Sequence, residues 1–332
     1  MRALSALVVL AALAASAPHA QSLGDVDGTF TLLRLDPSAR VAALGGVADV
    51  LTANPDDTGL ADPAVALYNP ALLTPASHRA LGVSYLDHQL DIRAGFATYA
   101  RNVRGVGTVG AAVRFLSYGD FERADEAGQG DGSTFGGSDT AVTLAVSRPL
   151  ATGFLGGSTL RGGVSLTAAF AGLDDASARL FAADLGVAAE LPGPAVVVGV
   201  AVRNLPLAFD ALGADEDAPA PDLRVSVAKR LRYIPLTVAV TGYDLQNLGA
   251  TGDGNALRHL NAGGELRLGR AISARAGYNF RRHDDLSTGT RLDLAGLTAG
   301  FGLSLRRIAI DYAYHGWSGF GGLHQFAVRT RL

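Results

Sequence analysis

From residue 79 onward the chain consists of short runs in which apolar side chains alternate with small, polar or charged ones. Val196, Val198, Val200 and Val202, for example, occupy every second position of one run. A period of two is that of a β-strand whose two faces meet different surroundings. The pattern predicts about fourteen strands, at 79–89, 92–102, 106–118, 139–149, 158–171, 180–191, 195–204, 222–232, 235–246, 258–268, 271–281, 293–305, 307–315 and 323–332.

Eight charged residues within these runs fall on one face in the predicted register. They are Arg114, Glu265, Arg267, Arg275, Arg281, Asp311, Arg329 and Arg331. An Arg on a lipid-facing surface costs roughly 2–4 kcal/mol at mid-membrane, so this face must point inward and the apolar face outward. The pattern therefore predicts an all-β fold, a transmembrane antiparallel β-barrel. The inward charges are expected to form a salt-bridge lattice between the wall and a plug.

The lengths of the connections alternate as well. Short connections are expected at 102–105, 192–194, 232–234, 269–270 and 306–307, and longer ones at 119–138, 172–179, 205–221, 247–257 and 282–291. Outer-membrane barrels have short periplasmic turns and longer extracellular loops. A soluble β-sandwich is the alternative, but it gives no reason for loop length to alternate. The hairpin near residues 90–91 is the exception to the alternation.

Both ends of the sequence fit an exported barrel. Residues 1–20 have a positively charged start, an apolar stretch at 4–15 and small residues before a cleavage site after Ala20, which predicts a signal peptide. A transmembrane anchor is the alternative, but the apolar stretch is shorter than the roughly 20 residues that span a bilayer. At the other end, the final alternating run stops on Leu332, as in barrels whose last strand carries the assembly signal.

Residues 21–78 differ from the barrel region, 79–332, in their pattern of apolar and polar residues. They are apolar without the strand period, and the stretch 37–46 predicts a short helix with Pro37 near its first turn and Gly45 or Gly46 past its end. We expect a plug inside the barrel, with a periplasmic extension as the alternative. The step Asn69-Pro70-Ala71 is the most distinctive motif of the predicted plug.

Composition narrows the class of protein. The 332 residues include 42 glycines, one lysine and no cysteine, and the net charge is −3. Abundant glycine disfavours a helical globule, the net charge gives no support for nucleic-acid binding, and the missing cysteine excludes disulfides and thiolate metal sites.

Motifs of catalysis and cofactor binding are weak. Gly105–Gly110 matches G-x-G-x-x-G but opens a strand instead of a helix, and neither H-E-x-x-H nor G-x-S-x-G occurs. The acidic residues at 125–126, 131 and 215–217 miss the spacing of an EF-hand, which favours solvated loop charge over calcium binding. We therefore expect no enzymatic activity, no cofactor and no metal.

Five segments, at 30–46, 69–73, 118–126, 257–261 and 277–282, carry a family resemblance. Their residues and their order along the chain resemble those of the PorV/PorQ family of outer-membrane barrels from the bacterial type IX secretion system. The resemblance extends from about residue 24 to residue 332. The resemblance implies a barrel similar to the long-chain fatty-acid transporters. It also implies an attachment complex in which such barrels hold a PorZ-like surface protein beside PorV- and PorU-like subunits and join cargo to lipopolysaccharide. It implies no catalytic residues.

Two functions follow as expectations. One is a non-catalytic outer-membrane anchor of the type IX attachment complex, and the alternative is a transporter for a hydrophobic small molecule. An apolar pocket between plug and wall favours the transporter, whereas a lumen packed with charge counts against it. The candidate partner residues of the anchor lie in the two longest outer loops: Phe121, Arg123, Asp125, Glu126, Asp210, Asp215 and Glu216.

Overall fold

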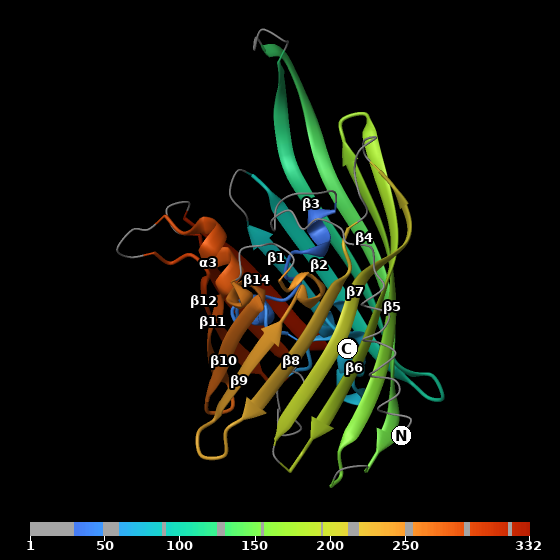
Figure 1. Ribbon diagram of the computed structural model, residues 1–332, viewed down its shortest axis with the longest axis vertical. Coiled ribbons are helices and arrows are strands. Elements are labelled where there is room, and N and C mark those ends of the chain that lie inside the picture. The colour runs from blue at the N-terminus through green and yellow to red at the C-terminus, as the bar shows by residue number, and fades with distance from the viewer. Residues whose placement is uncertain are drawn as a thin grey trace.

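A closed barrel of fourteen antiparallel strands forms the molecule, as the alternating pattern predicts (Figure 1). The computed structural model describes residues 30–48, 60–87, 91–124, 130–153, 156–193, 195–211, 219–249, 255–288, 293–317 and 321–332. The predicted signal peptide at 1–20 lies outside them. In the described ranges no helix is long and apolar enough to cross a membrane.

The strands follow one another around the barrel in chain order. They are β1 (Ala80–Asp87), β2 (Arg93–Val103), β3 (Gly107–Ala124), β4 (Gly130–Thr152), β5 (Thr159–Leu173), β6 (Ala176–Leu191), β7 (Val196–Asp210), β8 (Asp222–Arg230), β9 (Leu236–Gly242), β10 (Leu260–Leu268), β11 (Ile272–Asn279), β12 (Leu297–Leu305), β13 (Ile308–Gly316) and β14 (Gly322–Arg331). The first and last strands close the ring, with Ala80 opposite Arg331 and Tyr85 opposite Phe326. Closure leaves no unpaired edge at the level of the lipid.

The two ends of the barrel differ in their connections. The end where β1 begins and β14 stops carries the brief connections, such as Arg306-Arg307 between β12 and β13. We call it the short-turn end. The opposite, long-loop end carries the 3-10 helices η5 (Leu245–Asn247) and η6 (Ala256–His259) and the helix α3 (Phe280–Leu286). This arrangement agrees with the predicted alternation of connection lengths.

The outer surface is apolar and the inner face is mixed. In β1 the side chains of Val83 and Tyr85 are exposed, whereas the alternate residues Ser84 and Leu86 are buried. Leu144, Leu166 and Phe301 continue the exposed apolar surface on other strands. Exposed apolar side chains over most of a barrel are stable only against lipid, which agrees with the predicted orientation of the strands.

Three of the predicted outer loops are wrong in part. Much of 119–138 is strand, because β3 and β4 continue as a paired ribbon in which Phe121 stacks on Phe135 at a centroid distance of 5.4 Å. The segment 172–179 is a tight hairpin between β5 and β6, and 205–221 begins with the end of β7. The glycine and aspartate residues of these segments are typical of loops. Strands form there nevertheless, because backbone hydrogen bonds between neighbouring strands do not require alternating apolar side chains.

The described residues between 30 and 78 lie inside the barrel, and we call them the inner segment (Figure 1). Their short elements are η1 (Thr31–Leu33), α2 (Ala39–Ala42), η2 (Pro63–Leu67), η3 (Pro70–Leu72) and η4 (Pro75–Ser77). Helix α2 packs on β12, β13 and β14, and η3 packs on β4, β5 and β6. The inner segment thus contacts opposite walls of the barrel.

Candidate functional site

The Asn69-Pro70-Ala71 motif fixes the inner segment to one wall. Asn69 is fully buried and caps η3, because its Oδ1 accepts a hydrogen bond from the Ala71 backbone N–H at 3.0 Å. Its Nδ2 donates to the backbone oxygens of Val187 in β6 and Val200 in β7, each at 3.3 Å. Pro70 suits the first position of η3, where a backbone N–H would have no helical partner. The motif therefore fixes the start of η3 against the barrel wall. The hydrogen bonds of the Asn69 side-chain amide go to Ala71 and to the backbone of β6 and β7.

Two wall glycines make room for this anchor. A Cβ built on Gly186 would lie 1.9 Å from Asn69 Oδ1, and one on Gly163 would lie 2.4 Å from the Ala71 backbone nitrogen. Since real Cβ atoms do not approach other atoms so closely, a side chain at either glycine would displace the inner segment. Glycine in these two strands therefore reflects the close approach of the segment to the wall.

A buried network of charges lines the opposite wall. Arg40 of α2 donates two hydrogen bonds to Glu265 in β10, at 2.9 and 2.7 Å. Arg275 in β11 bridges Glu265 and Asp311, both at 2.7 Å, and Arg329 in β14 donates to Asp311 at 2.8 Å. Each of these five residues is at most 6% exposed. We call them the charge network.

The charge network confirms the predicted salt-bridge lattice in part, since four of the eight predicted charges belong to it, and Arg40 is an added member. Arg267 lies at its edge, 3.7 Å from Glu265, whereas Arg331 is exposed. Arg40 was not singled out from the sequence, although a lone arginine in the run Ala39-Arg40-Val41-Ala42-Ala43 was a usable signal. Other predicted members lie elsewhere: Arg114 donates to Thr143, and Arg281 pairs with Asp244 near the long-loop end. Removing one partner of a buried ion pair costs about 3–5 kcal/mol, so the network holds α2 firmly against the wall.

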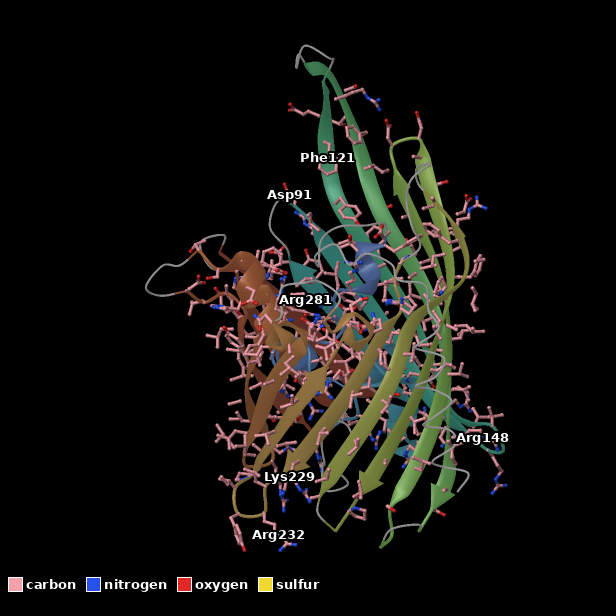
Figure 2. The ribbon with its side chains drawn as sticks, viewed as in Figure 1. Asp91, Phe121, Arg148, Lys229, Arg232 and Arg281 are labelled. Atoms are coloured by element: carbon pink, nitrogen blue, oxygen red, sulfur yellow. The ribbon has the colours of Figure 1, made fainter. Side chains whose placement is uncertain are left out.

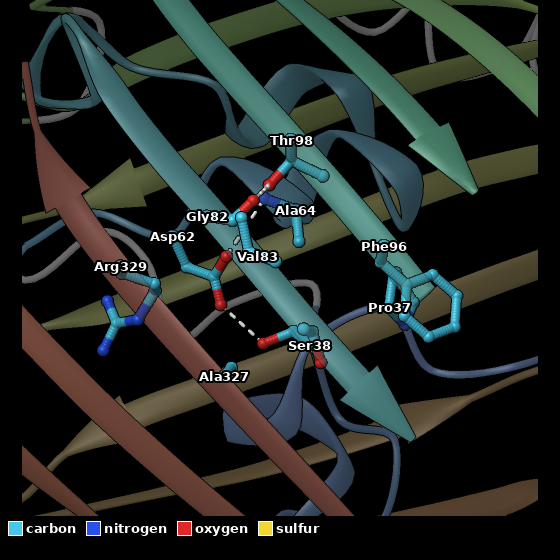
Figure 3. A pocket seen from close by; sticks show the side chains of 11 residues that line it. Pro37, Ser38, Asp62, Ala64, Gly82, Val83, Phe96, Thr98, Ala327 and Arg329 are labelled. Atoms are coloured by element: carbon cyan, nitrogen blue, oxygen red, sulfur yellow. Dashed lines mark hydrogen bonds between the residues drawn. The ribbon is translucent and has the colours of Figure 1, made fainter. Parts of the chain in front are cut away.

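A second set of polar contacts joins the two halves of the inner segment. The Ser38 hydroxyl donates to Asp62 Oδ2 at 2.5 Å, and the Asp62 Oδ1 accepts from the Ala64 backbone N–H at 3.0 Å. Arg329 also donates to the backbone oxygen of Leu60. Figure 3 shows Ser38, Asp62 and Arg329 around a cavity of about 10 Å³ between the inner segment and strands β1, β2 and β14. That volume holds about one water molecule.

The wall formed by β1 to β6 and β14 is largely apolar in its long-loop half. The exception is the buried Asp139 of β4, whose Oδ2 accepts from the Leu32 backbone N–H at 3.4 Å and from the Tyr118 hydroxyl at 2.9 Å. The inward-facing apolar side chains of this wall form a continuous cluster, which we call the apolar chamber: Leu86, Ala94, Phe96, Leu116, Ala141, Ala169, Ala171, Ala178, Leu180, Ala182 and Leu323. Phe30, Leu32 and Leu33 of the inner segment occupy the chamber and are at most 2% exposed. Ile92, Tyr118, Phe209 and Trp317 pack around it. A water-filled barrel would instead present polar side chains at these positions.

Polar groups limit the apolar chamber toward the short-turn end. One pleat further along the strands, Arg114 contacts Thr143 and the Ser165 hydroxyl donates to Asp184 at 2.6 Å. In the inner segment the Tyr68 hydroxyl donates to Asp36 at 3.1 Å. Burial raises the pKa of the Asp36 carboxyl, and burial together with the Asp36 charge raises the pKa of Tyr68 well above its ordinary value. These polar groups thus separate the apolar chamber from a second buried apolar cluster nearer the short-turn end, which includes Leu72, Leu73 and Ala145.

The candidate partner residues are only partly brought together. Phe121 and Arg123 lie on the β3–β4 ribbon, where the Arg123 guanidinium sits 5.5 Å from the Phe135 ring and pairs with Asp174 at 2.7 Å. Asp210 ends β7, opposite Arg179 of β6. The other four, Asp125, Glu126, Asp215 and Glu216, lie outside the described residues. Among the side chains that the structure describes, no group of three His, Asp or Glu residues is placed to hold a metal ion.

No protein-family model and no curated protein matches the sequence. Solved structures of similar fold include two forms of a channel described as the TodX monoaromatic hydrocarbon channel. A deletion mutant lacking S2 and S3 has a TM-score of 0.56 and 11% identity over 93% of this chain and 100% of its own, and a deltaS2 mutant has 0.53 and 12% over 88% and 97%. A FadL homologue from Pseudomonas aeruginosa has a TM-score of 0.47 with 12% identity over 88% and 97%.

These similarities establish the class of fold. The chain is an outer-membrane β-barrel of the Gram-negative type, as predicted, and its closed fourteen-strand barrel is similar in fold to the two TodX structures. At identities of 11% and 12% the likeness shows the fold alone.

Proposed function

We propose that the protein is an outer-membrane channel for small hydrophobic molecules. The observation that carries the proposal is the apolar chamber, in which inward-facing Leu86, Phe96, Leu116 and Leu180 replace the polar lining of a water-filled pore. Ligand sites for apolar molecules are concave, largely apolar and bordered by a few polar groups, as this chamber is bordered by Arg114 and Asp184. The shared fold with a monoaromatic hydrocarbon channel supports the same class of substrate.

The inner segment governs access in this proposal. Phe30, Leu32 and Leu33 fill the chamber with side chains of the chemistry that a substrate would have. A hydrophobic molecule therefore enters by displacing these three residues, and apolar contacts with the wall replace the contacts that are lost. Asn69 and the charge network hold the rest of the inner segment, so the displacement is confined to the residues near Phe30.

The charge network does not block such a route, because it lies on another part of the wall. Glu265, Arg275 and Asp311 are on β10, β11 and β13, whereas the chamber is formed by β1 to β6 and β14. The carboxylates of the network therefore lie in another sector than the chamber. Arg329 is the member of the network on a chamber strand, β14, and the chamber contains the buried carboxylate of Asp139 in β4. Transport of a hydrophobic molecule through the barrel involves no covalent step, so the proposal assigns no catalytic residue.

A pair of substitutions at one position tests the proposal. Leu116→Asn places an amide in the chamber wall, and Leu116→Met keeps the wall apolar and is usually tolerated. In proteoliposomes, influx of a monoaromatic hydrocarbon should fall strongly for Leu116→Asn and stay near the wild-type rate for Leu116→Met. Migration of unboiled samples on gels checks that both variants are folded. Equal influx through both folded variants would refute a route through the chamber.

A second candidate function is the non-catalytic anchor of a type IX attachment complex. It is supported by the five sequence segments and by the β3–β4 ribbon, which projects beyond the neighbouring strands at the long-loop end (Figure 1). In this proposal the ribbon, with Phe121 and Arg123, and the end of β7, with Asp210, contact a PorZ-like surface protein next to PorV- and PorU-like subunits. Shortening the ribbon to Ser117 and Ser138 should then release that protein and impair retention of cargo on lipopolysaccharide, while the barrel stays folded.

A further inference from the structure

Cations surround the barrel at its short-turn end. Eight of them point outward from a strand or lie in a turn and are exposed: Arg101, Arg104, Arg148, Lys229, Arg232, Arg270, Arg306 and Arg307. We call them the basic rim. They come from β2, β4 and β8 and from the turns after β2, β8, β10 and β12, so they are spread around the circumference. In Figure 2, Arg148 lies at this end on one side of the barrel, and Lys229 and Arg232 lie together on another side.

Few carboxylates accompany these cations. Among the described residues that reach the short-turn end, Glu190 is the acidic residue nearest to the mouth, and it is bound to Arg161 at 3.2 Å. The eight rim cations form no salt bridge with a described residue. The long-loop end is different, since exposed Asp91 and Asp174 there pair with Arg93 and Arg123 at 3.4 and 2.7 Å. Exposed cations without a described carboxylate partner therefore gather at the short-turn end.

The basic rim adjoins the apolar outer surface. Leu150 is 57% exposed two positions from Arg148, and Leu268 is 54% exposed two positions from Arg270. Leu305 and Ile308 flank Arg306-Arg307 in the same way, and Tyr233 beside Arg232 is 96% exposed. Arginine and lysine beside apolar residues can place their stems along hydrocarbon and their charged groups in the polar layer. The rim thus marks the level at which the hydrocarbon of the membrane ends.

The distribution of the rim identifies its ligand. A protein partner contacts one side of a barrel, and an ion entering the lumen would meet inward-facing cations such as Arg161. A ring of outward-facing cations at one level instead faces the leaflet of lipids that encloses the barrel. Phosphate is the group that arginine and lysine meet at that level.

We propose that the basic rim binds the phosphate groups of anionic phospholipids in the leaflet at the short-turn end. This proposal is independent of the route taken by any transported molecule. The rim would enrich phospholipids of net negative charge around the barrel and fix its depth and tilt. The long-loop end carries both signs of charge, in pairs such as Arg93–Asp91, so the rim also favours one orientation of the barrel in an asymmetric membrane.

Matched variants of the full chain test the rim. Arg148→Gln/Lys229→Gln removes two outward-facing strand cations of the rim. Arg93→Gln/Arg179→Gln removes two outward-facing strand cations at the long-loop end. Native mass spectrometry of each protein would measure bound phosphatidylglycerol relative to phosphatidylcholine of identical acyl chains, with lipid A as a third ligand. Heat-modified migration on gels verifies that each variant is folded.

The rim variant should lose phosphatidylglycerol preference by roughly fivefold for each cation removed, because each surface cation contributes about that factor to binding of anionic lipid. The long-loop variant should keep the wild-type preference, and added salt should weaken the preference of the wild type. An unchanged preference in the folded rim variant would overturn the proposal. So would a loss confined to lipid A, or an equal loss in both variants.

Discussion

Arg40 and Glu265 are separated by 225 positions in the chain and are joined by two hydrogen bonds inside the barrel, at 2.9 and 2.7 Å. The pair connects the inner segment to β10, and Arg275 then extends the connection to Asp311 and Arg329. Because all five groups are buried, each carboxylate depends on its arginine neighbours for the charge compensation that water would otherwise provide.

Glu265→Gln should destabilise the barrel by about 3–5 kcal/mol, because it leaves Arg40 and Arg275 with one carboxylate fewer. Urea unfolding in lipid vesicles would measure the change. The double variant Arg40→Met/Glu265→Leu should lose much less, because it removes one charge of each sign. If Glu265→Gln were as stable as the wild type, the network would not hold the inner segment.

Gly186→Ala should destabilise the protein by about 1–3 kcal/mol, which is typical of overpacking a tightly packed site. The added Cβ would meet Asn69 Oδ1, whereas a Cβ at Gly95 in β2 would have no atom within 4 Å. Gly95→Ala is therefore the matched control and should be close to neutral. Unfolding midpoints of the two variants, compared in the same lipid, decide the matter. Equal midpoints would mean that Asn69 is not fixed against β6.

The unfolding free energy should decrease as pH rises from about 4, the ordinary range of an aspartate, through the raised pKa of Asp36. In that range the folded protein retains a proton that the unfolded chain has released, so higher pH favours unfolding. Asp36→Asn keeps an acceptor for Tyr68 but cannot ionise. It should remove this part of the pH dependence and be the more stable protein at neutral pH. Parallel pH profiles for both proteins would contradict the assignment to Asp36.

The long-loop end should face the outside of the cell and the short-turn end the periplasm. Because the chain has no cysteine, single substitutions Gly130→Cys and Arg306→Cys are clean probes. An impermeant thiol reagent should label Gly130→Cys on intact cells and should label Arg306→Cys only after lysis. Labelling of Arg306→Cys alone on intact cells would invert the topology and would place the basic rim in the outer leaflet.

The sequence predicted the barrel well because strand alternation and membrane orientation are local signals. Thirteen of the fourteen predicted strands start within four residues of the observed start, and the exception is β4. The long ribbon of β3 and β4 escaped prediction because backbone pairing beyond the membrane leaves no periodic trace in residues such as Gly130–Gly137. The inward orientation of the charges was predictable from their energetic cost in lipid. The sequence did not show which of these charges would pair with each other.

The apolar chamber could not be predicted from the same rules. The rules for outer-membrane barrels favour polar residues on the inner face. Four apolar residues face inward here, and in the sequence they cannot be told apart from lipid-facing residues: Leu86, Phe96, Leu116 and Leu180. Only the register of adjacent strands shows that they share one region of the interior. Arg40 was missed for a similar reason, since its partner Glu265 lies on a distant strand.

Uptake by a deletion strain tests the proposed function most directly. The strain lacking this protein, and the same strain complemented with the wild-type chain, would be compared for accumulation of a monoaromatic hydrocarbon and for retention of surface proteins. We predict that the deletion lowers accumulation, that the wild-type chain restores it, and that a folded Leu116→Asn chain does not. Unchanged accumulation together with release of a PorZ-like surface protein and its cargo would contradict the channel and favour the anchor.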